Sequence, residues 1–201
     1  MEIDSPEPLL ILLHGGPATG KTTLGLRLAE TFGIPYYSKD GVKEPIFDHV
    51  GLPVAWETND GLSGRDMDEA SKTILISIIE SLLVARASCI IDSTFLAPHA
   101  PRFQSFQERH SFRLVQILCR TEAGELRRRL EGRAASGERH AGHQDQDLIQ
   151  RLDPEAIDRD YRHLEIGGLQ ITLDTTSATS DEEYEDVVGR IRKYWHQMER
   201  E

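Results

Sequence analysis

Cysteine is scarce in this sequence, and long apolar runs are missing from it. The two cysteines, Cys89 and Cys119, both lie in apolar segments, which predicts small buried core side chains rather than a disulfide framework or a cysteine metal site. No apolar run approaches the length of a membrane span, and no basic segment followed by an apolar one opens the chain. We therefore expect a soluble protein in the reducing cytoplasm, without a membrane partner.

Positive charge is also in deficit. The chain has 23 Lys and Arg against 34 Asp and Glu, a net charge of −11 at pH 7. A general nucleic-acid surface needs clustered cations to meet the phosphate backbone, so this balance argues against one. The 201 residues suffice for one α/β domain with a sizeable core. No internal repeat or long linker divides them, so we expect a single domain over residues 1–201, in an oligomeric state that the sequence leaves open.

A glycine-rich motif fills residues 15–22. Its pattern G-x-x-x-x-G-K-[ST] is met by Gly15, Gly20, Lys21 and Thr22. The backbone N–H groups of such a loop surround a phosphate, and the start of the following helix adds partial positive charge. The lysine would bridge the β- and γ-phosphates, and the threonine hydroxyl would bind Mg²⁺. The motif thus predicts a nucleoside triphosphate site built from Gly15, Gly16, Pro17, Ala18, Thr19, Gly20, Lys21, Thr22 and Thr23.

Both flanks of this motif have the expected form. Five apolar residues precede it, as a buried parallel strand over residues 9–14 requires. Leu24, Leu28 and Phe32 follow at helical spacing and predict a helix over residues 21–32. This strand–turn–helix context argues against a chance match.

Polar residues close the second expected strand, which covers residues 34–40. In a parallel sheet the carboxyl ends of strands face the ligand crevice, so Asp40 is a candidate for chemistry. The alternative is a helix N-cap formed by Ser38 and Asp40, and both roles are compatible. Lys39 and Lys43 are the neighbouring candidates for substrate binding.

Residues 41–63 are expected to form an insert on the acceptor side of the site. Their prolines and glycines indicate an irregular or short-helical segment from residue 45 onward. Trp56 and Arg65 are candidate substrate contacts, although an anchor of the insert to the core is the favoured explanation for Trp56. The following helix, over residues 64–87, carries a wide apolar stripe and is predicted to be core, without chemistry.

Asp92 ends the third expected strand, residues 88–94. A carboxylate at this place can hold Mg²⁺ directly or through water, which makes Thr22 and Asp92 the candidate metal ligands. The alternative is a solvated aspartate at the end of a strand.

Arginines gather between residues 127 and 143 of an otherwise acidic chain. Guanidinium groups there could close over a triphosphate and neutralise charge that develops during transfer. The candidates are Arg129, Arg133 and Arg139, whereas Arg127 and Arg128 fit an exposed helix balanced by glutamates.

Three further cationic or titratable residues need an explanation. Arg102 lies in the first turn of an expected helix, where a cation requires a partner, and is a candidate substrate contact. His140 and His143 are interpreted as anion contacts or lid packing rather than metal ligands, because no cysteine accompanies them.

Strands and helices alternate along the chain. The remaining strands are expected over residues 112–119 and 169–173, and the remaining helices over residues 101–110, 121–132, 144–165 and 181–198. This alternation predicts a parallel sheet with helices on both faces.

Together these motifs resemble the P-loop kinases of the nucleoside-monophosphate-kinase-like group. Within it the chain is most similar to the predicted small kinases grouped with zeta toxins, chloramphenicol phosphotransferase and the kinase domain of polynucleotide kinases. The resemblance implies a three-layer α/β/α sandwich, strand order 2-3-1-4-5 and a helical lid over about residues 121–147. It also implies that Asp40 deprotonates the acceptor hydroxyl and that Arg129 or Arg133 touches the phosphates. Asp174 and Thr175 would pass near the adenine.

We therefore expect transfer of the γ-phosphoryl group of ATP, with Mg²⁺, to a hydroxyl of a small molecule. ATP is favoured over GTP because the chain lacks an Asn/Thr-Lys-x-Asp run. A 5′-hydroxyl polynucleotide kinase or a nucleotide kinase ranks lower, since few cations flank the acceptor region. A neutral, polyol-like acceptor ranks first. A regulatory ATPase without an acceptor is the alternative of another class, although Asp92 starts no Asp-x-x-Gly motif.

Overall fold

Five parallel strands form the centre of the molecule. The computed structural model describes residues 7–50, 63–137, 140–143, 149–150, 153 and 161–196. The sheet has the order β2-β3-β1-β4-β5, which confirms the expected 2-3-1-4-5. The strands are β1 (Leu9–His14), β2 (Tyr36–Ser38), β3 (Cys89–Asp92), β4 (Arg113–Arg120) and β5 (Leu169–Asp174).

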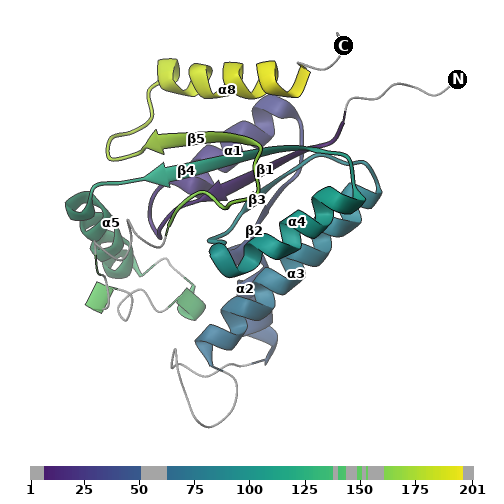
Figure 1. The fold of residues 1–201 in the computed structure, drawn as a ribbon. Coiled ribbons are helices and arrows are strands. Elements are labelled where there is room, and N and C mark those ends of the chain that lie inside the picture. The colour runs from purple at the N-terminus through teal and green to yellow at the C-terminus, as the bar shows by residue number, and fades with distance from the viewer. Residues whose placement is uncertain are drawn as a thin grey trace, which may run out of the picture.

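Helices cover both faces of this sheet, as the fold class requires (Figure 1). One face is covered by α1 and α8, and the other by α3 and α4, so the architecture is a three-layer α/β/α sandwich. The helices are α1 (Lys21–Phe32), α2 (Lys39–Val50), α3 (Gly64–Val84), α4 (Ala100–Arg109), α5 (Ala123–Ser136) and α8 (Asp181–His196), with 3₁₀ turns η1 (Ala97–His99) and η2 (Ala141–His143).

The central strand β1 is buried on both sides, which explains its unbroken apolar run. Leu9, Ile11 and Leu13 face α1 and α8, whereas Leu10 and Leu12 face α3 and α4. All five are fully buried.

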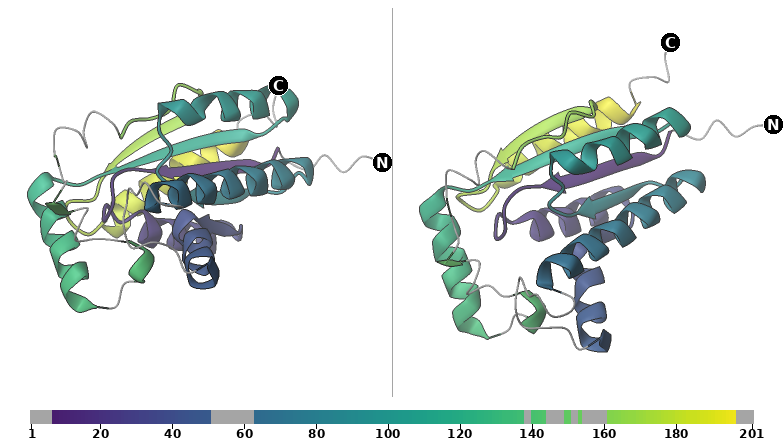
Figure 2. Two further views of the ribbon diagram at one scale, coloured as in Figure 1. Left: turned by 90° about the horizontal axis from the view of Figure 1, so that it is seen from below. Right: turned by 60° about the horizontal axis from the view of Figure 1, so that its bottom comes forward.

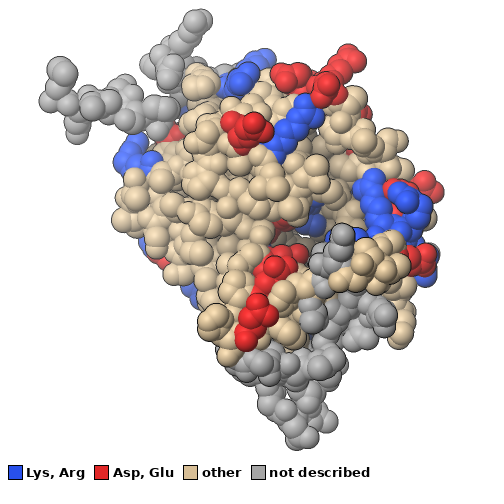
Figure 3. Space-filling model, turned by 180° about the vertical axis from the view of Figure 1, so that it is seen from behind, with Lys and Arg blue, Asp and Glu red and all other residues tan. Residues whose placement is uncertain are grey.

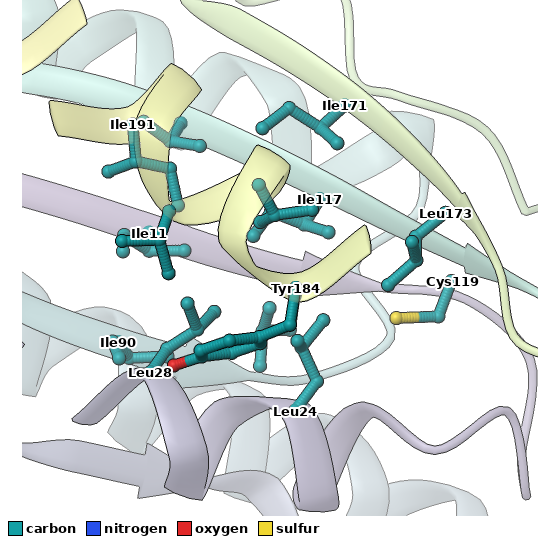
Figure 4. Close-up of a cluster of buried hydrophobic side chains, with 14 of the residues drawn as sticks. Ile11, Leu24, Leu28, Ile90, Ile117, Cys119, Ile171, Leu173, Tyr184 and Ile191 are labelled. Carbon is teal, nitrogen blue, oxygen red and sulfur yellow. The ribbon is translucent and has the colours of Figure 1, made fainter. Parts of the chain in front are cut away.

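The apolar cluster between the sheet and α8 includes the ring of Tyr184, which carries a polar hydroxyl group (Figure 4). Its ring reaches from α8 to Leu24 and Leu28 of α1. Its hydroxyl lies 2.6 Å from Thr31 Oγ1 and donates to the carbonyl of Arg27 over 3.0 Å. The buried ring therefore keeps its hydroxyl hydrogen-bonded while it joins two helices.

Both cysteines are buried free thiols, as predicted. Burial raises the pKa of Cys89 and of Cys119 to about 12, so neither thiol is reactive at neutral pH. Among the residues that the structure describes, no helix is long and apolar enough to cross a membrane.

The second strand is shorter than expected, because the chain turns into α2 at Lys39. Ser38 Oγ accepts a hydrogen bond from the Gly41 N–H over 2.9 Å, which caps the new helix. Asp40 therefore lies in the first turn of α2, and residues 45–50, expected to be irregular or short-helical, continue that helix through Pro45. Trp56, Arg139 and most of the helix expected over residues 144–165 lie outside the described residues.

The strands all end on one side of the molecule, where α5 lies opposite α2 and η2 lies beside α2 (Figure 2). Parallel topology thus brings the ends of β1, β2, β3 and β5 to a common edge.

Candidate functional site

The phosphate-binding loop connects β1 to α1 at this edge. Gly15 has φ +128°, and a Cβ atom there would lie 2.3 Å from the carbonyl oxygen of Cys119. Gly20, with φ +80°, is the N-cap of α1. Both positions therefore require glycine, the first for space and conformation and the second for conformation.

Lys21 lies across this loop. Its Nζ donates to the carbonyl oxygens of Gly16 over 2.6 Å and of Gly15 over 3.1 Å. Burial lowers the pKa of Lys21, although the nearby carboxylate of Asp92 opposes that effect. The ammonium group is thus held at the loop by carbonyl dipoles, at the place where a phosphate would supply a full negative charge.

Asp92 ends β3 next to the loop, and its position is fixed by two hydroxyl groups. Its Oδ2 accepts from Tyr36 over 2.7 Å and from Thr22 over 2.9 Å. Burial, together with the charge of Asp92, raises the pKa of Tyr36, so the phenol stays protonated and remains a donor.

This pair suits a hard cation. Thr22 and Asp92 offer oxygen ligands, which Mg²⁺ prefers, and Asp92 is only 6% exposed. Within the described part of the chain, no group of three or more His, Cys, Asp and Glu side chains could hold a metal ion. A magnesium ion here would thus complete its coordination with phosphate oxygens and water.

A cleft of about 1220 Å³ opens beside these residues. It is lined by the phosphate-binding loop, the first turns of α2 and α3, one side of α5 and the loop that follows β5. In the space-filling view, Lys and Arg side chains gather over α5 next to a hollow in the surface (Figure 3). The cleft brings together Lys21, Thr22, Asp40, Asp92, Arg129 and Arg133.

Asp40 lies at the junction of α2 and the segment around η2. Its Oδ1 is 4.0 Å from Lys39 Nζ and 3.8 Å from His143 Nδ1. His143 Nε2 is 2.7 Å from Glu44 Oε1, and His140 Nε2 is 2.9 Å from Asp48 Oδ1. The two histidines thus pack the lid segment against α2, one of the two roles expected for them.

Arg129 of α5 joins two loops. Its Nη2 donates to the carbonyl oxygens of Thr175 and Thr176 over 2.6 and 3.1 Å, and its Nη1 donates to that of Ala18 over 3.3 Å. Its Nε donates to Glu125 over 2.8 Å. The guanidinium therefore ties the phosphate-binding loop to the loop after β5, within reach of the predicted phosphate site.

The other arginines of α5 differ in exposure. Arg128 makes a two-fold hydrogen bond with Glu125, and this contact, with that of Arg129, lowers the pKa of Glu125 to about 2. Arg127 is exposed, while Arg133 is partly buried and lines the cleft. Arg128 also lines the cleft, although its side chain is 73% exposed and paired with Glu125, so its position differs from the one expected for an arginine outside the site.

The loop after β5 reaches the cleft through Thr175. This residue is 5% exposed, and its Oγ1 donates to the carbonyl oxygen of Thr19 over 2.8 Å. Asp174 instead is exposed, accepts from the Thr176 N–H over 2.8 Å and is absent from the cleft lining. Of the two predicted adenine neighbours, the structure therefore brings only Thr175 into the cleft.

The sequence matches a known family over most of its length. Residues 10–155 match a family model described as an AAA domain, AAA_33. The chain belongs to this family. No curated protein matches the sequence.

Solved structures similar to this family member have the same fold. The chain is 30% identical to a "putative kinase" from Chloroflexus aurantiacus. The match covers 94% of this chain and 98% of that one, with a TM-score of 0.76. Kti12 from Chaetomium thermophilum, solved with ADP-AlF3, gives 14% identity, 92% and 98% coverage and a TM-score of 0.62. A gluconokinase from Sinorhizobium meliloti is 16% identical, the match covers 97% of this chain and 98% of that one, and the TM-score is 0.53. The last two show the fold alone. The likeness to the 30% identical putative kinase supports a phosphotransferase in general.

The acceptor side of the cleft differs from the expectation. Lys39, Lys43 and Arg65 line it, as predicted. Arg102 is exposed on α4 and is not among the lining residues, and its charge acts instead on Glu80 of α3.

Sequence reasoning missed Asp68, Glu69 and Lys72, which also line the cleft. The helix α3 was predicted to be core, but these three side chains line the cleft, so the N-terminal part of α3 faces the site. Asp68 and Lys72 continue the buried face of Leu75 and Ile79, at steps of three or four residues. Two charged residues in phase with an apolar face are the signal that could have found them, because buried charges need a specific partner.

Proposed function

We propose that this protein transfers the γ-phosphoryl group of ATP to a hydroxyl group of a small molecule. One observation carries the proposal: a single cleft is lined by Lys21 of the phosphate-binding loop, by the hydrogen-bonded pair Thr22 and Asp92, and by a second, more exposed carboxylate, Asp40. A donor site alone would not need Asp40, which lies on the far side of the cleft, on α2.

Each group has a role in this reaction. The acceptor oxygen would attack the γ-phosphorus, the bond to the bridging β–γ oxygen would break, and ADP would leave. Asp40 would orient the hydroxyl and accept its proton, for which its 41% exposed side chain leaves access. Lys21, Arg129 and Arg133 would neutralise charge on the transferring group. Mg²⁺, held by Thr22 and Asp92, would neutralise charge on the β- and γ-phosphates when bound.

ADP release measured with and without hydroxyl compounds tests this proposal. We expect ADP release that rises with an acceptor, and a fall of at least about 100-fold in the acceptor-dependent rate for Asp40→Asn with ATP affinity retained. Lys21→Met should instead lower the transfer rate for every acceptor, because the transition state loses the stabilisation by the ammonium group. Asp186→Asn, the same change on exposed α8, is the matched control.

Two results would contradict the proposal. Full acceptor-dependent activity of Asp40→Asn would remove Asp40 from the reaction. ATP hydrolysis that no hydroxyl compound accelerates would favour the regulatory ATPase instead.

A further inference from the structure

Tyr36 lies behind the two candidate metal ligands. It is the first residue of β2, and its hydroxyl group donates to Asp92 Oδ2 over 2.7 Å. Thr22 Oγ1 donates to the same oxygen atom over 2.9 Å. Thr22 and Asp92 line the cleft, whereas Tyr36 is not among the described residues that do so. Tyr36 therefore acts on the cleft through the carboxylate in front of it.

Helix α1 leaves space for the ring of Tyr36 at Gly25. A Cβ atom at Gly25 would lie 2.5 Å from Tyr36 Cε2 and 2.7 Å from Leu13 Cδ1, which is too close for any side chain. The backbone of Gly25 has no positive φ, so its conformation alone would allow another residue. Glycine lowers the stability of a helix relative to alanine. The presence of glycine here is thus explained by the space that the ring occupies.

The two hydroxyl groups fix the orientation of the Asp92 carboxylate. Asp92 is only 6% exposed, so water has little access to replace either donor. Burial and the charge of Asp92 raise the pKa of Tyr36, so the phenol remains protonated and continues to donate. Among the described residues, all hydrogen bonds to this carboxylate go to Oδ2, so Oδ1 is left for another partner.

This arrangement is compatible with a hard cation at Thr22 and Asp92. The Thr22 hydroxyl group gives its one proton to Asp92 and keeps its lone pairs for another partner. A ligating carboxylate is itself usually held by hydrogen bonds, and the loss of such a bond typically lowers metal affinity about 10- to 100-fold. A hydroxyl group behind Asp92 is therefore expected to affect how tightly the ion binds.

We propose that Tyr36 is a positioning residue for Mg²⁺. Its hydroxyl group holds the Asp92 carboxylate in the orientation in which it binds the ion, directly or through water, and Gly25 makes room for its ring. This inference rests on the proposed function in one respect, the binding of Mg²⁺ by Thr22 and Asp92. It adds a residue of β2 that lies outside the phosphate-binding motif.

Tyr36→Phe removes the hydroxyl group and keeps the ring. Mn²⁺, a spectroscopic substitute for Mg²⁺, is titrated into the full chain with the protein in excess over ADP, and the free ion is measured by electron paramagnetic resonance. We expect the dissociation constant of the ion to rise at least about tenfold. The affinity for ADP in the presence of EDTA should stay at the wild-type value, because Tyr36 does not line the cleft. Competition with Mg²⁺ gives the affinity for the natural ion.

Tyr37→Phe is the matched control. Tyr37 follows Tyr36 in β2, but its ring packs into the core on the other face of the sheet. This variant should bind the ion as the wild type does. Circular dichroism and the thermal midpoint without ligands report whether each variant is folded. Equal losses of ion affinity in Tyr36→Phe and Tyr37→Phe would overturn the inference, because they would reflect a general change in β2.

Gly25→Ala tests the same role without a change at Tyr36. The added Cβ atom must displace the ring, so we expect weaker ion binding, and little additional loss when Gly25→Ala is combined with Tyr36→Phe. Gly189→Ala on α8, where a Cβ atom would have no neighbour within 4 Å, is the control. Losses that add in full in the double variant would overturn the part assigned to Gly25.

Asp92→Asn separates this inference from the proposed metal site. If Asp92→Asn weakens ion binding and Tyr36→Phe does not, the inference is overturned and the proposed site stands. If neither variant weakens ion binding, the ion is not held by Asp92, and both the proposed site and the inference are overturned. These measurements need no phosphoryl transfer, so they do not depend on the identity of the acceptor.

Discussion

Gly15 lies where the chain has no room for a side chain. Its φ is +128°, and a Cβ atom would lie 2.3 Å from the Cys119 carbonyl oxygen, so Gly15→Ala would have to displace backbone of β4. We expect a loss of at least about 2 kcal/mol in the free energy of unfolding, together with weaker ATP binding, because strained backbone alone costs about 1–3 kcal/mol. Urea unfolding and ATP titration measure the two effects.

Gly124→Ala is the control for this substitution. Gly124 lies in α5, and a Cβ atom there would have no neighbour within 4 Å. This change should be neutral or slightly stabilising, because alanine favours a helix. Equal stability of the Gly15 and Gly124 variants would contradict the argument from close approach.

The residues of the phosphate-binding loop could be predicted because their spacing is local in sequence. Lys21 and Thr22 follow Gly20 directly, so no tertiary contact is needed to place them. The contacts of Asp68 with Lys39 and Lys72 could not be predicted in this way, because α2 and α3 bring them together only when they pack. The same holds for Tyr36, whose hydrogen bond to Asp92 spans two strands.

Helix α2 and turn η2 are joined by two histidine–carboxylate contacts, which hold the lid segment near the cleft. His143→Ala would remove the contact of 2.7 Å to Glu44 and the approach of 3.8 Å to Asp40. Loss of about 1 kcal/mol would raise the open population of this segment about fivefold. We expect faster tryptic cleavage after the arginines of α5 and a higher KM for the acceptor.

His49→Ala is the matched control, because His49 is also on α2 and, among the described residues, its Nδ1 contacts the carbonyl of Pro45 in its own helix alone. Its cleavage rate should equal that of the wild type. If His143→Ala is cleaved no faster than His49→Ala, the two contacts do not hold the lid segment.

At the scale of elements, hydrophobic periodicity predicted the five strands and most of the helices. It did not predict that α2 is one continuous helix, and residues 161–165, expected to be helical, are not. The bounds of β1 and α1 agree with the prediction because an apolar run and a glycine turn define them. The β2–α2 boundary was misplaced, since a three-residue strand capped by Ser38 gives no periodic signal. Asp40 was placed at the correct edge of the sheet nonetheless, because strand end and helix start lie together there.

The whole molecule combines a strongly acidic chain with a cationic cleft. The net charge is −11, yet one cavity is lined by Lys21, Lys39, Lys43, Lys72, Arg128, Arg129 and Arg133. Such a distribution attracts small anions into the cleft while the outer surface repels a polyanion. This contrast is consistent with a phosphate donor of small size, and it gives no support to a nucleic-acid channel.

Global stability should depend on pH through His14, the last residue of β1. It is 1% exposed, and neither ring nitrogen has a hydrogen-bond partner among the described residues. Burial, and then the charges of His163 and Lys21, lower its pKa to about 3, while Gln116 opposes this. The ring is therefore neutral in the folded protein at every pH above about 3.

The unfolded chain can protonate this ring below about pH 6.5, and the folded protein cannot, so the free energy of unfolding must fall as pH falls below that value. Between pH 7.5 and pH 5 this group alone accounts for a loss of about 2 kcal/mol. Carboxylates such as Glu125, with a pKa of about 2, stabilise the folded protein less only as the pH falls below about 4.5.

Urea unfolding at pH 7.5 and pH 5 tests this prediction. The loss in the free energy of unfolding between the two pH values should be smaller by about 2 kcal/mol in His14→Leu, whose side chain never titrates. His163→Ala is the control and should change the dependence less, because His163 is only half-buried. An unchanged dependence in His14→Leu would show that the ring is protonated within the fold.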